Sequence, residues 1–536
     1  MASEWLAAAM ATSDWQQVGV TLVALYFSSR VVAQLYARAT MSDAERNAPH
    51  VPRPKGTLPF LRNTLQALAH NADFHDFWAG LSDEYDGATV QVKMLGRPEI
   101  ISVATPELFE DVLKTHFESF AKGPYLNSVT SDLLGNGIFA VDGPQWVRQR
   151  KMVSNLFSLR MLRESMAETV HKHVQVLNRV LQRHGDSKTP ADIANLMSRF
   201  TIETFGEIGF GVNLESLETV EEHPFAIAFD SVQRLLVERF LRPPWFWKTQ
   251  RWLNVGVEGE LKQNIRVIHD TVLEIIDKSL KNRKSRQLKE PENKKDIISL
   301  FLDNASYDGA DENDKSNPEL LRDIVVGFLI AGRDTTSQAL SWFLYNITHH
   351  PDVEKKIREE LTKELPGLMR GEIESPSMEQ SHKLMYMEAA LNESLRLHPP
   401  VPGNLKQAMK DVVLSDGTFV KAGWSVSIAT YTLGRMKGVW GPDVREYKPE
   451  RWIDSATGKL IPVPAYKFST FNAGPRMCLG MNLAMMEVKI VVASLLAKFR
   501  LELVPNQTVV YDFSVSLPVK GALLMNILPV DAKKTA

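Results

Sequence analysis

The residue with the most distinctive chemistry in this sequence is Cys478, the only cysteine among 536 residues. A lone thiol cannot form an intrachain disulfide or supply a multi-cysteine zinc site. Gly474 and Gly480 flank it, where the backbone must turn sharply or approach another group closely. A helix is expected over 482–499, and the positive end of its dipole favours the thiolate of Cys478. A buried structural cysteine is the commoner role for this residue type, but this neighbourhood favours a metal ligand.

A second group of reactive side chains lies in the middle of a long apolar segment. Asn317, Pro318 and Glu319 provide a cap, a proline at the first helical position and an acid in the first turn, so they predict a helix that runs to about residue 350. Its centre reads Ala-Gly-Arg-Asp-Thr-Thr over 331–336. Glycine lowers helix propensity, and the polar side chains can bond back to helix carbonyls. The segment is therefore predicted to loosen locally.

Two pairs of charged or aromatic residues have helical spacing. Glu393 and Arg396 are three residues apart, and Trp146 and Arg150 are four apart, so each pair shares a helix face. On an exposed surface, a Glu–Arg pair contributes a few tenths of a kcal/mol. A Trp beside an Arg is most often surface packing.

The stretch around Cys478 resembles the haem-binding loop of cytochrome P450 enzymes, Phe-x-x-Gly-x-Arg-x-Cys-x-Gly, at Phe471, Gly474, Arg476, Cys478 and Gly480. The resemblance implies haem b, with the Cys478 thiolate as its axial iron ligand, which favours O–O cleavage. It also implies that Arg476 pairs with a haem propionate, that Phe471 shields the sulfur, and that the glycines let the loop lie against the macrocycle.

The resemblance extends to the other motifs. The segment 331–336 resembles the oxygen-activation motif, which implies that the Thr335 hydroxyl steadies the bound oxygen molecule and that Asp334 delivers protons from solvent. Trp146 and Arg150 are expected to face the haem propionates. Glu393 and Arg396 resemble a buried pair that is joined by the arginine of a Pro-Glu-Arg motif, here Arg451.

Several longer stretches resemble the eukaryotic fatty-acid omega-hydroxylase branch: 120–124, 132–139, 434–441 and 447–452. This implies hydroxylation of the terminal carbon of medium- or long-chain fatty acids, with O2 and two electrons. A departure at Gly403-Asn404 leaves chain length and regiochemistry open, and alkanes, sterols or other lipophilic metabolites remain alternative substrates. The stretch 239–248, which ends near 251–254, is an aromatic and proline-rich connector. Its cations could hold the carboxylate: Arg242, Lys248 and Arg251.

Two rival functions remain open at this point. The first is a haem protein that does not activate oxygen, such as an electron carrier or a gas sensor. The second keeps the fold but rearranges hydroperoxides without O2 or a reductase. The Asp334-Thr335 pair argues against the first, because such proteins need no proton relay. The presence of Thr335 argues against the second, because enzymes of that kind lose the helix threonine.

The composition predicts an ordinary globular protein, with 44% hydrophobic and 24% charged residues. The resemblance implies a mainly α fold with small β-sheets (α+β), a triangular body and a long central helix; short strands are expected over 88–105. The net charge of −2 gives no reason to expect nucleic acid as a partner. No Gly-x-Gly-x-x-Gly unit opens a βαβ segment, so electrons are expected from NADPH-cytochrome P450 reductase.

The N-terminal region has the character of a membrane anchor. The first 29 residues lack Lys and Arg, and the largely apolar stretch 15–36 is long enough to span a bilayer. Basic residues follow it, which predicts an endoplasmic-reticulum membrane protein with one N-terminal span and a cytosolic catalytic body. An amphipathic helix of a soluble protein is the alternative. The expected organisation is an anchor over 1–40, a proline-rich hinge over 41–59 and one catalytic domain over 60–536.

Overall fold

A computed structural model describes residues 41–219, 222–287, 296–304 and 318–530, with the isolated residues 21, 24, 28, 31 and 32. The anchor predicted for 1–40 therefore lies outside the described residues, apart from those five positions. Within the described ranges, no helix combines the length and apolar character that crossing a membrane requires.

Helices dominate the described chain. The α-helices are α3 (Asp43–Asn47), α4 (Thr64–Ala69), α5 (Phe74–Glu84), α6 (Pro106–Glu110), α7 (Gly123–Leu134), α8 (Gly143–Ser154), α9 (Leu159–Met161), α10 (Ala167–Ser187), α11 (Ile193–Phe210), α12 (Pro224–Leu241), α13 (Pro244–Leu253), α14 (Gly256–Gln287), α15 (Ile297–Asn304), α16 (Pro318–His349), α17 (Pro351–Glu364), α18 (Pro366–Met369), α19 (Met378–Ser381), α20 (Met385–Leu397), α21 (Thr430–Leu433), α22 (Lys437–Trp440) and α23 (Met481–Lys498). A π-helical turn at Asp111–Thr115 follows α6.

The strands of the described chain form three small sheets. They are β1 (Val90–Val92), β2 (Ile100–Val103), β3 (Phe120–Ala121), β4 (Ala191–Asp192), β5 (Asn404–Ala408), β6 (Val412–Val413), β7 (Phe419–Val420), β8 (Ser425–Ile428), β9 (Phe499–Leu503) and β10 (Leu524–Pro529). The largest sheet has the order β1-β2-β8-β5-β3, in which only β2 and β8 run parallel. The others are β4-β10-β9 and the hairpin β6-β7. This architecture confirms the predicted mainly α fold with small sheets.

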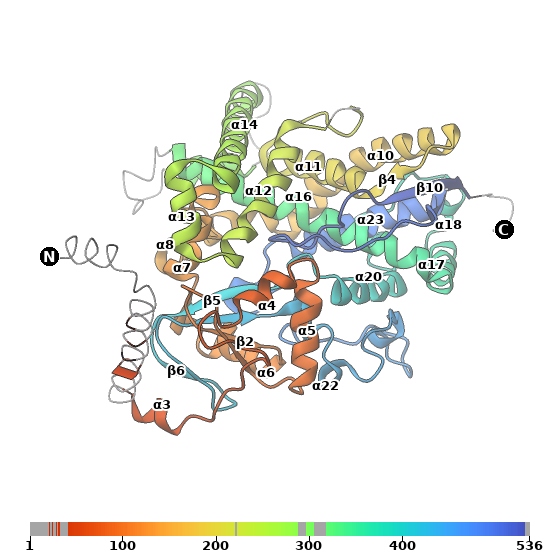
Figure 1. Cartoon of the computed structure of the whole chain (residues 1–536). Coiled ribbons are helices and arrows are strands. Elements are labelled where there is room, and N and C mark those ends of the chain that lie inside the picture. Colours follow the sequence, from red (N-terminus) through yellow and green to blue (C-terminus); the bar gives the residue numbers. More distant parts are fainter. Residues whose placement is uncertain are drawn as a thin grey trace.

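The long helix α16 lies in the interior of the helical part, behind α12 and beside α11 in Figure 1. It packs against α11, α14, α20 and α23, so apolar side chains are buried around its whole circumference. The five-stranded sheet lies on the other side of the molecule, in the lower half of the view, with α4 and α5 beside it. The proline and acid at the start of the predicted helix correspond to the observed start of α16 at Pro318.

The prediction that 331–336 loosens the helix is wrong for this structure, because α16 is continuous from Pro318 to His349. Gly332 has a packing role instead. A Cβ atom at this position would overlap the ring of Phe205 on α11, so glycine allows the two helices to approach closely. The expected bond from a polar side chain to a helix carbonyl is present, since the Thr335 hydroxyl donates to the Ala331 carbonyl at 2.7 Å.

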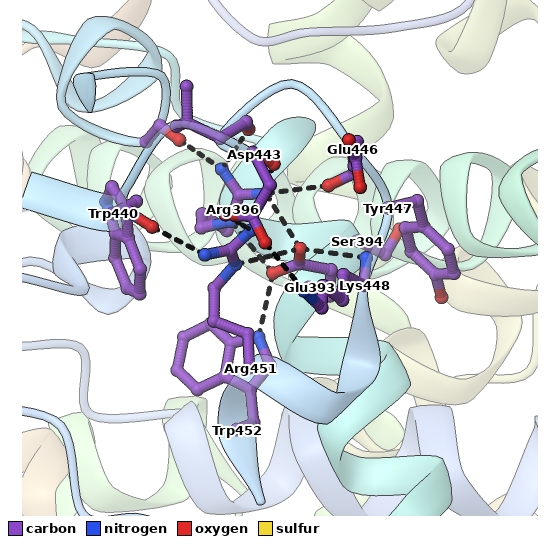
Figure 2. Close-up of polar contacts among 12 residues, drawn as sticks. Glu393, Ser394, Arg396, Trp440, Asp443, Glu446, Tyr447, Lys448, Arg451 and Trp452 are labelled. Carbon is purple, nitrogen blue, oxygen red and sulfur yellow. Dashed lines mark hydrogen bonds and ion pairs between the residues drawn. The ribbon is translucent and has the colours of Figure 1, made fainter.

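A buried ionic network connects α20 to the segment that precedes the cysteine loop, the loop 471–480 that contains Cys478 (Figure 2). The Glu393 carboxylate accepts hydrogen bonds from Arg396 at 2.8 Å and from Arg451 at 3.3 Å. It also accepts from the backbone N–H of Lys448 at 3.0 Å and from the indole N–H of Trp452 at 2.9 Å. The side chains of Glu393 and Arg396 are fully buried, which confirms the predicted triad.

The aromatic connector spans the end of α12, where Arg242 is the C-cap, and the helix α13. The tryptophans of α13 have different environments. Trp245 and Trp252 are 63% and 82% exposed. Trp247 is 2% exposed and packs against the guanidinium of Arg239, whose Cζ lies 4.8 Å from the ring centroid. The face of α13 that carries Trp247 therefore packs into the protein core, and the face that carries Trp245 and Trp252 is an exposed aromatic surface.

Candidate functional site

The loop before α23 has a tightly determined backbone. The N–H of Cys478 donates to the Phe471 carbonyl at 2.9 Å, and that of Met477 donates to the Gly474 carbonyl at 3.0 Å. Gly474 has φ +66°, and a Cβ atom there would overlap the Leu113 carbonyl oxygen in the π-helical turn. Glycine is therefore required at 474 both for its backbone angle and for the close approach.

The Cys478 thiol opens into a cavity while protein surrounds it on the other sides. Burial raises the pKa of the thiol above its usual value. The backbone N–H groups of Gly480 and Met481 and the charge of Arg150 lower it, but by less. The helix N-terminus thus acts in the predicted direction, but burial outweighs it. A bound cation at the sulfur would reverse this balance, because metal coordination deprotonates a thiol.

The cavity above Cys478 has a volume of about 660 Å³ and mostly apolar walls. Helix α16 contributes Ala331, Gly332 and Thr335 to one side, and the cysteine loop contributes Phe471 and Gly480 to the floor. A Cβ atom at Gly480 would lie 3.6 Å from the Phe157 ring and 4.0 Å from the sulfur, which are ordinary contacts. The φ of Gly480 is −87°, so neither its backbone angle nor its contacts with the described residues require glycine at this position.

Trp146 and Arg150 lie on one face of α8, as predicted, and both line the cavity. The Arg150 Nη2 donates to the Met477 carbonyl at 2.7 Å, which ties α8 to the cysteine loop. Two guanidinium groups pack against the Trp146 ring. Cζ of Arg476 lies 4.4 Å from the ring centroid, and Cζ of Arg150 lies 5.6 Å from it. The indole therefore holds two cations side by side at this end of the cavity.

Two lysines join these arginines. Arg476 donates to Asp142 at 2.7 Å, and Lys122 donates to the amide oxygen of Asn404 at 3.2 Å. The Nζ of Lys406 is buried and has no hydrogen-bond partner among the described residues. Burial and the charge of Arg476 lower the pKa of Lys122 to about 8. Burial, with the charges of Lys122 and Arg476, lowers the pKa of Lys406 well below its usual value.

These residues fit the cofactor that the sequence motifs imply. Three buried cations, Lys122, Lys406 and Arg476, face one carboxylate, Asp142, so the cluster lacks negative charge. An unpartnered buried ammonium is costly, and anionic groups such as the two propionates of haem would balance it. At the floor of the cavity, one soft thiolate ligand suits a haem iron. The apolar walls suit the flat face of a macrocycle.

Asp334 also lines the cavity, where it is buried in a chain of polar contacts. Its carboxylate accepts from Gln233 Nε2 at 2.7 Å and from Arg333 Nη1 at 2.8 Å. Arg333 also binds Asp230 at 2.7 Å, a carboxylate that is half exposed to solvent. Burial raises the pKa of Asp334 to about 7, although Arg333 opposes the shift. The Thr335 hydroxyl, in the cavity wall, donates to the Ala331 carbonyl at 2.7 Å.

The sequence-predicted residues therefore converge on one cavity, while other members of the site were not predicted. Lys122, Asp142 and Lys406 come from three distant segments, and no local pattern marks them as one cluster. Lys122 was visible only as part of the stretch 120–124 that resembles the hydroxylase branch. The cations predicted on the aromatic connector do not line the cavity: Arg242 pairs with Glu238, Arg251 pairs with Asp132, and Lys248 lies over Trp247.

We predict that Arg150→Ala lowers haem affinity by about tenfold or more, because a hydrogen bond to a charged group contributes about 1.5–3 kcal/mol. The matched control is Lys151→Ala, which removes a cation from the exposed face of the same helix. Haem content per chain, measured as pyridine haemochrome after dilution and gel filtration, compares the two variants. Equal haem retention would remove Arg150 from the site.

Comparisons with known proteins agree with this geometry. The family model described as Cytochrome P450 matches residues 52–525. Cytochrome P450 94A2 of Vicia sativa is 34% identical over 462 residues, covering 84% of this chain and 86% of its own. Cytochrome P450 94B3 of Arabidopsis thaliana is 38% identical over 456 residues, covering 83% and 85%. Cytochrome P450 86B1 of the same plant is 35% identical over 441 residues, covering 79% and 76%. With its single cysteine at the floor of an apolar cavity, the chain belongs to the cytochrome P450 family of haem-thiolate monooxygenases.

Proposed function

We propose that this monooxygenase hydroxylates the terminal carbon of medium- or long-chain fatty acids, using O2 and electrons from NADPH-cytochrome P450 reductase. The observation that carries the proposal is the cavity of about 660 Å³ with mostly apolar walls, which Cys478 also lines. An apolar enclosure of this kind suits an alkyl chain. The hydroxylase-like stretches at 120–124, 132–139, 434–441 and 447–452 support the same substrate class.

Haem supplies oxygen activation and C–H oxidation when it is bound. In our proposal, Cys478 ligates its iron, and Arg476, Trp146 and Arg150 hold its propionate end. Phe471, Gly474 and Gly480 shape the loop beneath it. Lys122 and Lys406 are additional candidates to bind the haem propionates. Both are buried near Arg476, and the cluster they form has too few carboxylates to balance its positive charge.

Proton delivery is assigned to Asp334 and Thr335. Asp334, which lines the cavity, connects through Arg333 to the half-exposed carboxylate of Asp230, which provides a polar route from solvent to the cavity wall. A group with a pKa near 7 can both accept and release a proton at neutral pH. Thr335 lies next to it and presents a hydroxyl in the cavity wall.

Thr335→Ala should retain haem and substrate binding but divert electrons from product to hydrogen peroxide. The variant loses the one hydroxyl that we assign to the oxygen-binding side of the cavity, while its neighbours keep their contacts. Peroxide formed per NADPH consumed measures the effect, and Thr335→Ser, which keeps the hydroxyl, is the control. Unchanged coupling in the alanine variant would contradict the assignment.

The substrate proposal is tested by turnover with the reductase present. A panel of C12 to C18 acids, n-alkanes and sterols should yield omega-hydroxy acids as the main products, identified by mass spectrometry. Products from alkanes or sterols alone would reject the fatty-acid assignment but keep the monooxygenase. Mainly in-chain hydroxy acids would reject the terminal position.

We further propose an endoplasmic-reticulum anchor over 1–40, a hinge over 41–59 and a single cytosolic catalytic domain over 60–536. The absence of Lys and Arg before residue 30 and the basic residues after the apolar stretch support this orientation. The exposed Trp245 and Trp252 on α13 provide a separate aromatic surface that suits a membrane interface.

Deletion of residues 1–40 should convert the protein from detergent-requiring to salt-extractable, with its haem spectrum retained. The exposed surface of α13 remains in the truncated chain, so we expect residual binding to vesicles, which Trp245→Ser/Trp252→Ser should abolish. Cell fractionation and vesicle flotation measure both effects. A full-length protein that is freely soluble after fractionation would disprove the anchor.

A further inference from the structure

Arg97 is a buried cation in the wall of the cavity, and it has no anionic partner among the residues that the structure describes. It follows Gly96 in the turn between β1 and β2, and it is 7% exposed. Among the described residues, no carboxylate forms an ion pair with it, and its Nε has no hydrogen-bond partner. Its Nη2 donates to two carbonyls at the end of α12, those of Arg239 at 3.1 Å and Arg242 at 3.5 Å.

Other buried arginines of this protein do have partners. Arg239, Arg333 and Arg396, each 2% exposed, are paired with carboxylates: Asp132 and Glu258, Asp230 and Asp334, and Glu393, respectively. Arg435 has no ion pair with the described residues, but its guanidinium stacks on the Tyr431 ring, 3.4 Å from the centroid. A guanidinium is seldom buried without such compensation, since burying an unpaired charge is costly. Among these buried arginines, Arg97 is therefore the exception: it lines the cavity and has neither a carboxylate nor an aromatic ring as its partner.

A second unpartnered polar group lies beside Arg97. Tyr125, on α7, also lines the cavity, and its buried hydroxyl has no partner among the described residues. The two side chains are close enough for the charge of Arg97 to lower the pKa of the Tyr125 phenol, although burial raises that pKa overall. A guanidinium and a phenol hydroxyl together offer the donors that one carboxylate accepts.

This pair is distinct from the cations that we assign to the haem propionates. The charges that act on the pKa of Lys406 are those of Lys122, Arg476 and Asp142, whereas the titratable group beside Arg97 is Tyr125, whose raised pKa keeps its phenol uncharged at neutral pH. The surrounding wall is apolar and aromatic: Val92, Met94, Ile100, Phe240, Leu241 and Phe513. A ligand that balances the charge of Arg97 and also fits this apolar wall has one anionic end and a long apolar body.

We propose that Arg97 and Tyr125 bind the carboxylate of the substrate, so that its alkyl chain extends along the apolar cavity toward Cys478. This inference rests on the proposed function, because it assumes a fatty acid as substrate. The planar guanidinium fork matches a carboxylate, which is ionised at neutral pH. Anchoring one end of the chain would leave its other end to meet the oxidising centre, which is what terminal hydroxylation needs.

The test uses the haem-loaded, full-length enzyme and spectral titration with hexadecanoic acid and with its methyl ester. Arg97→Gln should weaken acid binding by about 30-fold or more, the effect of removing one partner of a buried charge pair. Tyr125→Phe, which removes only an unpartnered hydroxyl and so should not disturb folding, should weaken it by about tenfold. Binding of the ester should change by no more than about twofold in both variants.

Two controls separate anchoring from folding and from cofactor binding. Lys93→Gln removes a cation from the same hairpin, one that pairs with Glu99 outside the cavity, and should leave acid binding unchanged. Arg97→Lys keeps the charge and should recover part of the affinity. The reduced carbon-monoxide spectrum should be normal in every variant, because none of these residues is assigned to haem.

The outcomes are distinguishable. If the wild type produces omega-hydroxy acids but Arg97→Gln and Tyr125→Phe bind the acid as tightly as the wild type, the anchor is wrong and the proposed function stands. If the wild type binds the ester as tightly as the acid and produces no hydroxy acid, the proposed function fails, and the anchor fails with it. Loss of haem in Arg97→Gln and Tyr125→Phe would reassign both residues to the cofactor.

Discussion

Replacing Cys478 with serine should yield a protein whose reduced carbon-monoxide complex has no red-shifted Soret band. The band requires a thiolate opposite the carbon monoxide, and Cys478 is the only thiol in the chain. A serine hydroxyl is far less acidic than a thiol and is a poor ligand for haem iron. We therefore expect complete loss of the band rather than a graded decrease.

The matched control is Thr470→Ser, which introduces a serine into the same segment. It keeps the hydroxyl that donates to the Leu395 carbonyl at 3.1 Å, so the loop should retain its backbone and the enzyme its band. Total haem and circular dichroism should accompany the spectrum, to separate loss of the ligand from loss of the fold. Retention of the band in Cys478→Ser would overturn the ligand assignment.

The second large effect is expected at Glu393, where a substitution acts on the fold. Glu393→Ala removes the shared acceptor of Arg396, Arg451, the Lys448 backbone and the Trp452 indole (Figure 2). Two guanidinium groups then remain buried without this carboxylate. Removing one partner of a buried ion pair costs about 3–5 kcal/mol, which is a large share of the roughly 5–15 kcal/mol that stabilises a typical protein.

We therefore expect little soluble, haem-loaded Glu393→Ala protein under conditions in which the wild type accumulates. Glu359→Ala on α17 is the control, because it breaks only an exposed pair with Lys355 and should cost about 0–1 kcal/mol. Soluble yield and the denaturant midpoint of the haem-loaded protein measure the difference. Equal midpoints in the two variants would show that the buried network contributes no more than a surface ion pair.

The predictions that succeeded depend on local spacing. The start of α16 at Pro318, the shared face of Trp146 and Arg150, and the short strands β1 and β2 within 88–105 can all be read from neighbouring residues, because helices and strands impose short periods. The glycines around Cys478 are informative for the same reason, since a turn requires them at fixed distances along the chain.

The unpredicted features depend on contacts between distant segments. Lys122, Asp142 and Lys406 meet only after α7, the turn before α8 and β5 have packed together. The state of the Cys478 thiol is decided by burial, which a single sequence does not reveal, against the helix dipole, which it does. In the same way, Arg242 and Arg251 are excluded as anchors because each pairs with a carboxylate. Arg97 stands out only because none of the carboxylates in the described part of the chain pairs with it.

Because the chain has a single cysteine, thiol labelling can also measure the fraction of chains that carry the cofactor. Because the thiol of Cys478 opens into the cavity, a chain without haem presents one reactive sulfur, and a chain whose sulfur is bound to iron presents none. Moles of thiol labelled per mole of polypeptide then equal the unloaded fraction of a preparation, without an extinction coefficient for the haem. The raised pKa of the thiol means that alkylation at neutral pH proceeds more slowly than for free cysteine and accelerates as the pH increases. The labelling rate thereby gives a second, independent report on how enclosed the empty sulfur is.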